Sequence, residues 1–331
     1  MQTGKLAPDY ATPYSLAELD AAAELIYRYM KPTPQYCWPL LSRRLGCEVW
    51  VKHENFTCVG GFKVRGGILY AEQLRRENPS ATGMVAATRG NHGQSLAYGA
   101  RLFGFKIVIV VPHGNSVEKN AAMEALGAEL IVHGADFQES LEYATQLAKE
   151  RKLIMAPSFD LTLTKGVSTY ALELFRGAPQ LDVIYVSIGM GSGVCGVMAA
   201  RNALGLKTTV VGVVSAGAPA YSISFRSHKL ESHAVTTFIA DGMACRKPDP
   251  LALEMIWAGV DHVVEVTDEE VEAAMRAYFS DIHSVVEGAG AAGLAAAMKE
   301  RERLAGKRIG LVLSGGNVDR EVFARVLSQG T

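Results

Sequence analysis

One lysine stands among four glycines in the stretch VGGFKVRGG, residues 59 to 67. Glycine is used where the main chain turns tightly or approaches another group closely. A lysine in such a turn, with Phe62 beside it, is seldom a solvated surface charge, and desolvation lowers the pKa of an amine. The residue types therefore raise the question of what Lys63 approaches there. A tight turn with a lysine on its rim is the alternative that this stretch alone leaves open.

Three further segments carry residues suited to chemistry, and each follows a run that predicts a β-strand. They are ATRGNHGQS (87–95), GMGSGVCG (189–196) and SGGN (314–317). Ligands of open parallel sheets bind where the carboxyl ends of the strands meet. We therefore expect these three segments and the glycine-lysine turn to lie together at one edge.

Short β-branched runs alternate with helical patterns along the chain. The runs are apolar nearly throughout, as strands covered on both faces should be. They predict strands over 48–54, 83–88, 105–112, 128–134, 182–189, 208–215, 262–267 and 308–316. Thr267 followed by Glu270 predicts a capped helix start. The alternation predicts an α/β protein with mainly parallel sheets, and the region 216–260 is the least regular.

The glycine loop has two rival interpretations. GSGVCG matches the G-x-G-x-x-G pattern of dinucleotide folds, but that fold needs an acidic residue at the end of the next strand. The strand TTVVGVVS ends in Val213, Val214 and Ser215, so the dinucleotide interpretation loses its support. Small residues leading into a helix still offer free amides to a single phosphate. A glycine-rich turn without a ligand stays open as the plain alternative.

The composition excludes several classes of protein. The chain has 331 residues, a net charge of -1 and 20% charged residues, so it has no basic excess for nucleic acid or a membrane surface. Its five scattered cysteines contain no CxxC pair, which argues for reduced thiols rather than disulfides. The first residues have no apolar core typical of a signal peptide. We expect a cytoplasmic protein whose partner is a small molecule.

Six segments in order resemble the fold-type II family of pyridoxal-phosphate enzymes, and within it the serine/threonine dehydratases. They are GFKVRGG, TRGNHGQ, GMGSG, IADG (239–242), VVEGAGAAG (285–293) and SGGN. The resemblance implies two open twisted parallel-sheet domains with helices on both faces. Residues 1–82 and 161–331 would form the large cofactor-binding domain, with 83–160 as a smaller inserted domain. It also implies pyridoxal 5'-phosphate as cofactor, a homodimer, and closure of the domains over substrate.

The resemblance assigns roles residue by residue. Lys63 would be the catalytic residue, joined covalently to the cofactor and later taking the α-proton of the substrate. The cofactor-binding residues would be Phe62, Lys63, Asn91, Gly189, Met190, Gly191, Ser192, Gly193, Glu287 and Ser314. The residues around the substrate carboxylate would be Thr88, Arg89, Gly90, Asn91 and His92. A neutral hydroxyl at Ser314 makes the cofactor ring a weaker electron sink, which favours prompt elimination.

Three positions depart from the family pattern. Gly61 replaces the serine that usually precedes the Phe-Lys pair, which suggests a roomier pocket. Arg89 stands where serine racemases carry the serine that acts as the opposite acid/base, and an arginine stays protonated. We therefore favour a dehydratase over a racemase. Val214 stands where metal-dependent members carry a glutamate, so no metal site is expected.

The implied activity is a pyridoxal-phosphate dependent dehydratase, or ammonia-lyase, that converts a β-hydroxy-α-amino acid to a keto acid and ammonia. We rank 3-phenylserine first, because of Gly61 and Arg89, then threonine or serine, then 3-hydroxyaspartate. A β-replacement enzyme is a second interpretation, but the His92 after Asn91 favours the dehydratases. A cofactor carrier without turnover is a third. With the chain ending soon after its last strand, no regulatory domain is expected and a catabolic role is favoured.

Overall fold

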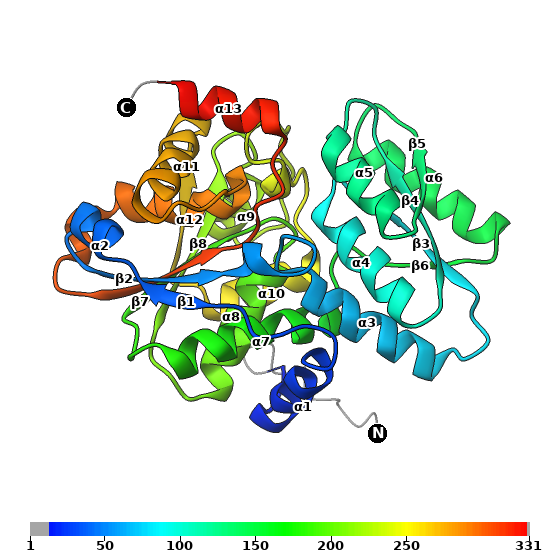
Figure 1. Ribbon diagram of the computed structural model, residues 1–331, viewed down its shortest axis with the longest axis horizontal. Helices are drawn as coiled ribbons and strands as arrows, with labels where there is room; N and C mark the ends of the chain where they lie inside the picture. The colour runs from blue at the N-terminus through cyan, green and yellow to red at the C-terminus, as the bar shows by residue number, and fades with distance from the viewer. Residues whose placement is uncertain (1–12, 330–331) are drawn as a thin grey trace.

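The computed structural model describes residues 13–329, and two β-sheets lie side by side within it (Figure 1). The first twelve residues, on which the expectation of no signal peptide mainly rests, lie outside this range. The six-stranded sheet has the order β1-β2-β10-β7-β8-β9, and the four-stranded sheet has the order β5-β4-β3-β6. Every pairing is parallel except that of β1 with β2.

The strands reproduce the predicted runs closely. Their bounds are β1 Gln35–Cys37, β2 Glu48–His53, β3 Gly83–Ala87, β4 Lys106–Val111, β5 Glu129–Val132, β6 Ile154–Met155, β7 Val183–Ser187, β8 Thr209–Ser215, β9 His262–Val266 and β10 Arg308–Leu313. All eight predicted strands are confirmed. The short strands β1 and β6 were not predicted, because three or two residues are too few to show a period.

Helices connect the strands and cover the sheets. They are α1 Leu16–Ile26, α2 Pro39–Leu45, α3 Val64–Glu77, α4 Asn91–Leu102, α5 Val117–Ala125, α6 Phe137–Glu150, α7 Leu161–Gly177, α8 Ser192–Ala203, α9 Ala220–Ser227, α10 Pro250–Gly259, α11 Asp268–Ile282, α12 Gly288–Lys299 and α13 Arg320–Ser328, with 3-10 turns η1 Glu54–Phe56, η2 Asp241–Met243 and η3 Arg301–Leu304. The predicted capping box of Thr267 and Glu270 begins α11. The irregular region 216–260 contains α9, η2 and α10.

The larger sheet is covered on both faces. One core joins it to α2, α11 and α12, and a second core on the opposite face joins it to α1, α7, α8 and α10. The apolar runs of β7 and β8 face both cores, because successive side chains point to opposite faces. The predicted fold class is therefore confirmed for this sheet.

The smaller sheet has its own two cores, one with α4 and α5 and one with α6. We call residues 83–155, which contain all its strands, the small unit, and the rest of the described chain the large unit. The domain bounds predicted from the sequence stay a prediction. The helix α3 packs on α4 of the small unit and on α7 of the large unit, and it runs between them in Figure 1.

Glycines allow the backbones of α3, α4 and α7 to touch. A Cβ added at Gly67 would lie 2.3 Å from the carbonyl oxygen of Ser95, and one at Gly166 would lie 2.4 Å from that of Arg65. Real Cβ atoms do not approach so closely, so only glycine fits at these two helix crossings. The start of α3, which carries Lys63, is thereby fixed against both neighbours.

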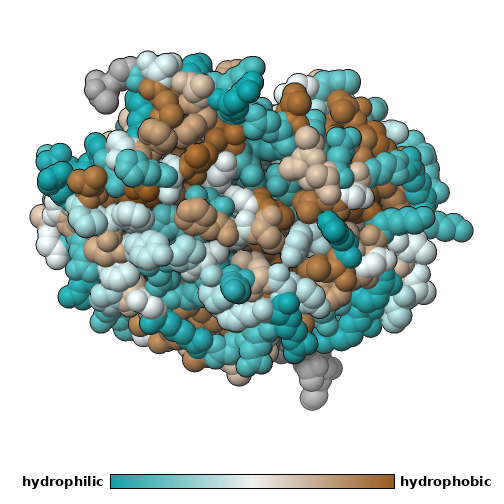
Figure 2. Space-filling model, viewed as in Figure 1, coloured by the Kyte–Doolittle hydropathy of each residue, from teal (hydrophilic) through white to brown (hydrophobic). Residues whose placement is uncertain are grey.

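On the face of the molecule that Figures 1 and 2 present, polar and apolar residues are mixed. Figure 2 shows teal and brown residues interspersed, with brown residues gathered toward the upper left, where Figure 1 places α11 and α13. Phe279 on α11 is 42% exposed. Among the helices of residues 13–329, none has the length and apolar composition needed to cross a membrane.

Candidate active site

The glycine-lysine turn is tied to the SGGN segment. The amide of Phe62 donates to the carbonyl of Ser314 at 3.0 Å, and Gly61 forms an antiparallel bridge with Gly315. The turn follows η1 and leads directly into α3, and SGGN follows β10, the neighbour of β2 in the sheet. Two segments about 250 residues apart in sequence therefore meet, as the strand ends predict.

The glycine loop lies beside Phe62. A Cβ at Gly193 would lie 3.6 Å from Cζ of Phe62, which places the ring against the start of α8. The ring also packs edge-on against Tyr170, whose hydroxyl donates to the carbonyl of Gly193 at 3.2 Å. The turn with Lys63 and the glycine loop thus share one wall of the site.

The start of α8 offers free backbone donors. Gly191 has φ 103°, a left-handed conformation that glycine favours, and it precedes the first helical residue, Ser192. Within the described chain, the amides of residues 190–193 donate to no other group. A Cβ at Gly189 would lie 2.4 Å from the carbonyl oxygen of Gly242, so the IADG segment borders this loop. Free amides at a helix start suit a phosphate.

The segment TRGNH is held by its own threonine. Oγ1 of Thr88 accepts from the amides of Gly90 at 3.0 Å and Gly93 at 3.3 Å, while its own O–H is left to donate. Ser95 on α4 donates to the carbonyl of Lys63 at 2.5 Å. The segment therefore lies directly beside the lysine.

Asn91 joins the two units. Its Nδ2 donates to Oε1 of Glu287 at 2.6 Å, and its Oδ1 accepts from Asn317 at 2.8 Å. Asn317 also donates to the carbonyl of Val59 at 2.9 Å. Through Asn91, the segments TRGNH, VVEGAGAAG and SGGN reach one another and the beginning of the glycine-lysine turn.

Lys63 is half-buried, and its Nζ lies 4.4 Å from the centre of the Phe62 ring. Burial lowers the pKa of Lys63, and the charge of Lys119 lowers it further, against the opposing effects of Glu287 and Asp241. A lower pKa leaves more of the amine unprotonated near neutral pH, which is the form that acts as nucleophile or base.

His92 is neutral in this setting. Burial, together with the charge of Lys63, lowers the pKa of His92 from 6.5 to about 4. Its Nε2 is buried and has no hydrogen-bond partner among the described residues. A buried polar atom without a partner is costly, so Nε2 is available to a ligand.

Sequence reasoning did not identify Lys119, and it left Asp241 of IADG without a role. Lys119 on α5 is buried. Its Nζ lies 2.5 Å from Oδ2 of Asp241 and 3.7 Å from Oε2 of Glu287. Burial works against its charge, but the two carboxylates raise its pKa overall. Burial raises the pKa of Glu287, and the nearby Lys119 opposes that shift. We call these three residues the Lys119 cluster.

Arg89 makes no hydrogen bond or ion pair with any described residue, although it is half-buried. No neighbouring acid among the described residues therefore holds this guanidinium. Gly61 has space for a small side chain, and the roomier pocket expected there stays a prediction. A Cβ added there would lie 3.5 Å from the carbonyl oxygen of Ser314 and 3.6 Å from the Asn91 side chain, which are ordinary contacts.

A second group of buried charges surrounds Arg65, two residues after Lys63 in the chain. Arg65 is fully buried and donates to Glu54 at 2.8 and 2.9 Å and to Glu173 at 2.6 and 3.0 Å. Lys52 donates to Glu173 at 2.5 Å and to the carbonyl of Thr33 at 2.7 Å. We call these five residues the Arg65 cluster. The sequence assigned Arg65 no specific role, because its partners are far away in sequence.

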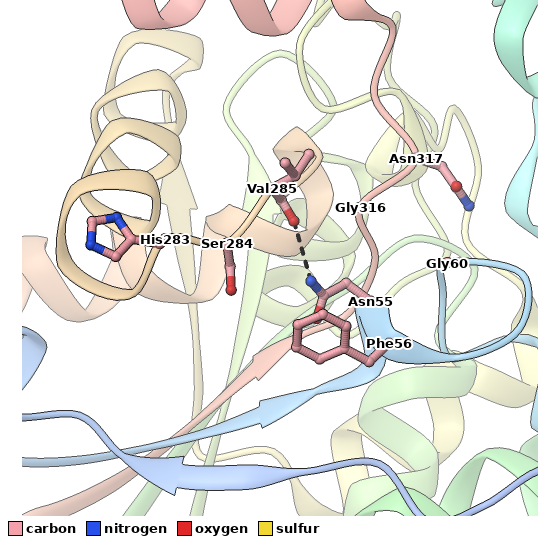
Figure 3. Close-up of a pocket in the computed structure, with 8 residues that line it drawn as sticks. All are labelled: Asn55, Phe56, Gly60, His283, Ser284, Val285, Gly316 and Asn317. Atoms are coloured by element: carbon pink, nitrogen blue, oxygen red, sulfur yellow. Dashed lines mark hydrogen bonds between the residues drawn. The ribbon is translucent and has the colours of Figure 1, made fainter.

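A cavity of about 330 Å³ opens on the outer side of the glycine-lysine turn (Figure 3). Asn55 and Val285 are joined across it by a hydrogen bond of 3.3 Å. It is lined by Asn55, Phe56, Gly60, His283, Ser284, Val285, Gly316 and Asn317. No predicted site residue lines it, so it adjoins the candidate site through Gly60 and Asn317 without being part of it.

A family model described as pyridoxal-phosphate dependent enzyme matches residues 26–315. The chain belongs to this family. The predicted family, fold class and cofactor are therefore confirmed. The predicted role of each site residue stays a prediction.

Two relatives of this pyridoxal-phosphate enzyme are ammonia-lyases. The enzyme is 32% identical over 292 residues to an L-threonine ammonia-lyase of Thermotoga maritima, covering 88% of this chain and 72% of that protein. It is 32% identical over 308 residues to an L-threo-3-hydroxyaspartate ammonia-lyase of Saccharomyces cerevisiae, covering 93% and 94%. The structure of maize serine racemase superposes with a TM-score of 0.87 at 27% identity, covering 96% and 97%.

The residues present fit the cofactor. The free amides at the start of α8 suit its phosphate, and the half-buried amine of Lys63 suits its aldehyde. Ser314 is buried beside the turn and makes no side-chain hydrogen bond within residues 13–329. For the same residues, no three His, Cys, Asp or Glu side chains are grouped as a metal site requires. The expectation of no metal stays a prediction.

Proposed function

We propose that this pyridoxal-phosphate enzyme is an ammonia-lyase that removes the β-hydroxyl and the amine of a β-hydroxy-α-amino acid, giving a keto acid and ammonia. The observation that carries the proposal is that all six family segments meet around the half-buried Lys63. The two ammonia-lyase relatives support the same reaction class.

The roles of the chain's own groups follow from their positions. Pyridoxal phosphate, when bound, supplies an electron sink for charge that develops at the substrate α-carbon. The Lys63 amine takes the α-proton, because its lowered pKa keeps part of it neutral. The amides of residues 190–193 hold the phosphate, and the O–H of Thr88 donates to the substrate carboxylate. The neutral His92 has its one ring N–H on the carbonyl of Pro157, so its free Nε2 can only accept a hydrogen bond from the substrate. The β-hydroxyl leaves as one water molecule. A second water molecule hydrolyses the released imine to the keto acid and ammonia, so the overall reaction consumes no water.

The side-chain preference rests on Arg89. A half-buried guanidinium without an acidic partner is available to a group on the substrate. It offers a bidentate contact to a second carboxylate, as in 3-hydroxyaspartate, or a cation–π contact to the ring of 3-phenylserine. We keep 3-phenylserine first, threonine or serine second and 3-hydroxyaspartate third.

A substrate panel on purified enzyme with added cofactor tests the reaction. Keto acid and ammonia are measured from threonine, serine, 3-phenylserine and 3-hydroxyaspartate. Release of both products in equal amounts from at least one of them is the expected result, with the largest kcat/KM for 3-phenylserine. A clear preference for threonine would reject the ranking, and no keto acid from any of the four would reject the ammonia-lyase.

Arg89→Lys and Arg89→Met separate the two contacts that Arg89 offers. Lysine keeps the charge but loses the planar fork, whereas methionine keeps only bulk. If a carboxylate is bound, activity on 3-hydroxyaspartate falls more in the methionine variant than in the lysine variant, while activity on serine changes little. If activity on serine fell as much as activity on 3-hydroxyaspartate, Arg89 would instead bind the carboxylate that all four substrates share.

Borohydride reduction of the cofactor-loaded enzyme, followed by peptide mapping, tests the covalent link. The expected result is a pyridoxyl group on Lys63. Label on another lysine would overturn the assignment of the catalytic residue. Lys119 is the informative comparison, since it is the other buried lysine beside Glu287.

A further inference from the structure

The Lys119 cluster crosses the boundary between the two units. Lys119 belongs to the small unit, whereas Asp241 lies in η2 and Glu287 precedes α12, both in the large unit. The Lys119 side chain passes over Gly90, where an added Cβ would lie 2.5 Å from its Cδ. One lysine therefore contacts the substrate-side segment with its stem and two carboxylates of the other unit with its ammonium.

The contacts continue beyond the lysine. Glu287 accepts from Asn91 of the small unit, and Asn91 in turn accepts from Asn317 of the large unit. A polar chain from Asp241 through Lys119, Glu287 and Asn91 to Asn317 thus crosses between the units four times. Close to Lys119, the hydroxyl of Ser116 donates to Asp319 at 2.5 Å, at the start of α13. The same end of α5 thereby meets the large unit at two places.

One acceptor in this series of polar contacts has no hydrogen bond. Oε2 of Glu287 is buried and makes no hydrogen bond among the described residues, and the ammonium of Lys119 lies 3.7 Å away. A small further approach of the two units would bring that pair within hydrogen-bond distance. Separation of the units would instead take the Lys119 ammonium away from Asp241 and Glu287 and leave two like charges facing each other, which is costly.

We propose that Lys119 is a positioning residue that holds the small unit against the large unit, so that Asn91 reaches Glu287 beside Lys63. The ammonium acts through Asp241 and Glu287 and takes no part in bond making. This proposal concerns the chain alone and does not depend on which substrate is used.

Hydrogen–deuterium exchange of the protein without added cofactor tests it directly. Lys119→Met keeps the length and the apolar stem that crosses Gly90 but removes the charge. We expect exchange about tenfold faster in peptides over 88–93, 115–123 and 239–243, because loss of an interface raises local opening. Peptides of β9 and of residues 143–150 in α6, which pack within their own units, should exchange as in the wild type.

Arg246→Gln is the matched control. Arg246 of the large unit lies 4.0 Å from Asp136 of the small unit, but the pair is exposed, with side chains 70% and 47% accessible. An exposed pair of this kind stabilises little, so this variant should match the wild type. If it accelerated exchange at the boundary as much as Lys119→Met, any contact between the units would suffice and the special role of Lys119 would be wrong.

Asp241→Asn provides the second variant. If Lys119 acts through Asp241, the double variant should exchange no faster than the faster single variant, because the two changes remove one interaction. Rates that multiply would overturn the proposal, and so would wild-type rates in Lys119→Met. Faster exchange over the whole chain would also overturn it, because it would assign Lys119 to general stability rather than to the boundary.

Discussion

The Arg65 cluster and the Lys119 cluster both lie near Lys63 in the fold, the first joined to it through α3 and the second through its charges, and they are built differently. In the Arg65 cluster each carboxylate accepts from two or more donors, and all five residues belong to the large unit. In the Lys119 cluster one carboxylate oxygen has no hydrogen bond, and the cation comes from the other unit.

The difference indicates that the surroundings of Lys63 differ in how easily they open. We call the Arg65 cluster the fixed side and the Lys119 cluster the changeable side. A buried ion network with every partner in place resists opening, because breaking it leaves unpaired charges. The Arg65 cluster therefore fixes the start of α3, which carries Lys63. An incompletely paired cluster loses less when it separates, so the Lys119 cluster resists opening less than the Arg65 cluster does.

Lys63 itself is the position with the largest expected effect. Lys63→Ala should lower keto-acid formation by about 10⁴-fold or more, because the amine is both the cofactor's anchor and the base. Stability should change little, since the side chain makes no hydrogen bond in the described chain. A discontinuous assay of keto acid measures the loss. Lys165→Ala, a lysine 3.4 Å from Glu18 on the outer surface, should keep full activity. If Lys63→Ala kept activity within tenfold of the wild type, Lys63 would not be the catalytic residue.

Arg65→Met tests the fixed side. It leaves Glu54 and Glu173 buried with only Lys52 as a cation, so the free energy of unfolding should fall by about 3–5 kcal/mol. Denaturant unfolding measures it. Arg176→Met is the matched control, because Arg176 pairs with Asp20 at the surface and should cost less than about 1 kcal/mol. Similar losses in both variants would mean that burial does not distinguish the Arg65 cluster.

His92 tests how dry the changeable side is. Its pKa is lowered from 6.5 to about 4 in the folded chain. Between these values the unfolded chain binds a proton that the folded chain does not, so stability falls as the pH drops. The loss reaches at most about 3 kcal/mol near pH 4. His92→Asn should lose less over the same range, while His53, whose pKa is also lowered to about 4, contributes equally to both proteins. Parallel stability curves would show that water reaches His92.

Two glycines give the smallest and most local test. A Cβ at Gly315 would lie 2.3 Å from Oε1 of Glu287, whereas one at Gly61 meets only ordinary contacts. Gly315→Ala should displace Glu287 from Asn91 and lower kcat/KM by about 10- to 100-fold, since misplacement near the chemistry is costly. Gly61→Ala should stay within about twofold of the wild type. The reverse order would show that the site is tighter at Gly61 than at Glu287.

The strands and the meeting of the motif segments could be predicted from the sequence. Apolar runs mark strands, and parallel strands place their ends at one edge, so segments as distant as GFKVRGG and SGGN were expected to meet. The contacts of Lys119 could not be predicted in this way. Its helix, SVEKNAAMEALG, has an ordinary amphipathic pattern, and nothing local indicates that its lysine is buried against Asp241.

The same reason explains the other omissions. Arg65 is only two residues from Lys63, but Glu173 comes from α7, more than 100 residues later, and no spacing rule joins them. The helix α1 was missed although Leu19, Ala23 and Ile26 follow a helical spacing and Ser15 with Glu18 forms a capping box. The strand β1 and the helix α2 are too short to show a period. Long-range partners and short elements depend on tertiary packing, which a single sequence does not display.

The backbone contacts at Gly67 and Gly166 have a practical consequence for enzyme engineering. Because three helices touch main chain to main chain around the root of the reactive lysine, there is no side-chain volume in that region to exchange. Libraries that seek a new substrate range will therefore yield folded variants when they randomise Gly61 and Arg89, and mostly misfolded ones when they randomise the helix crossings.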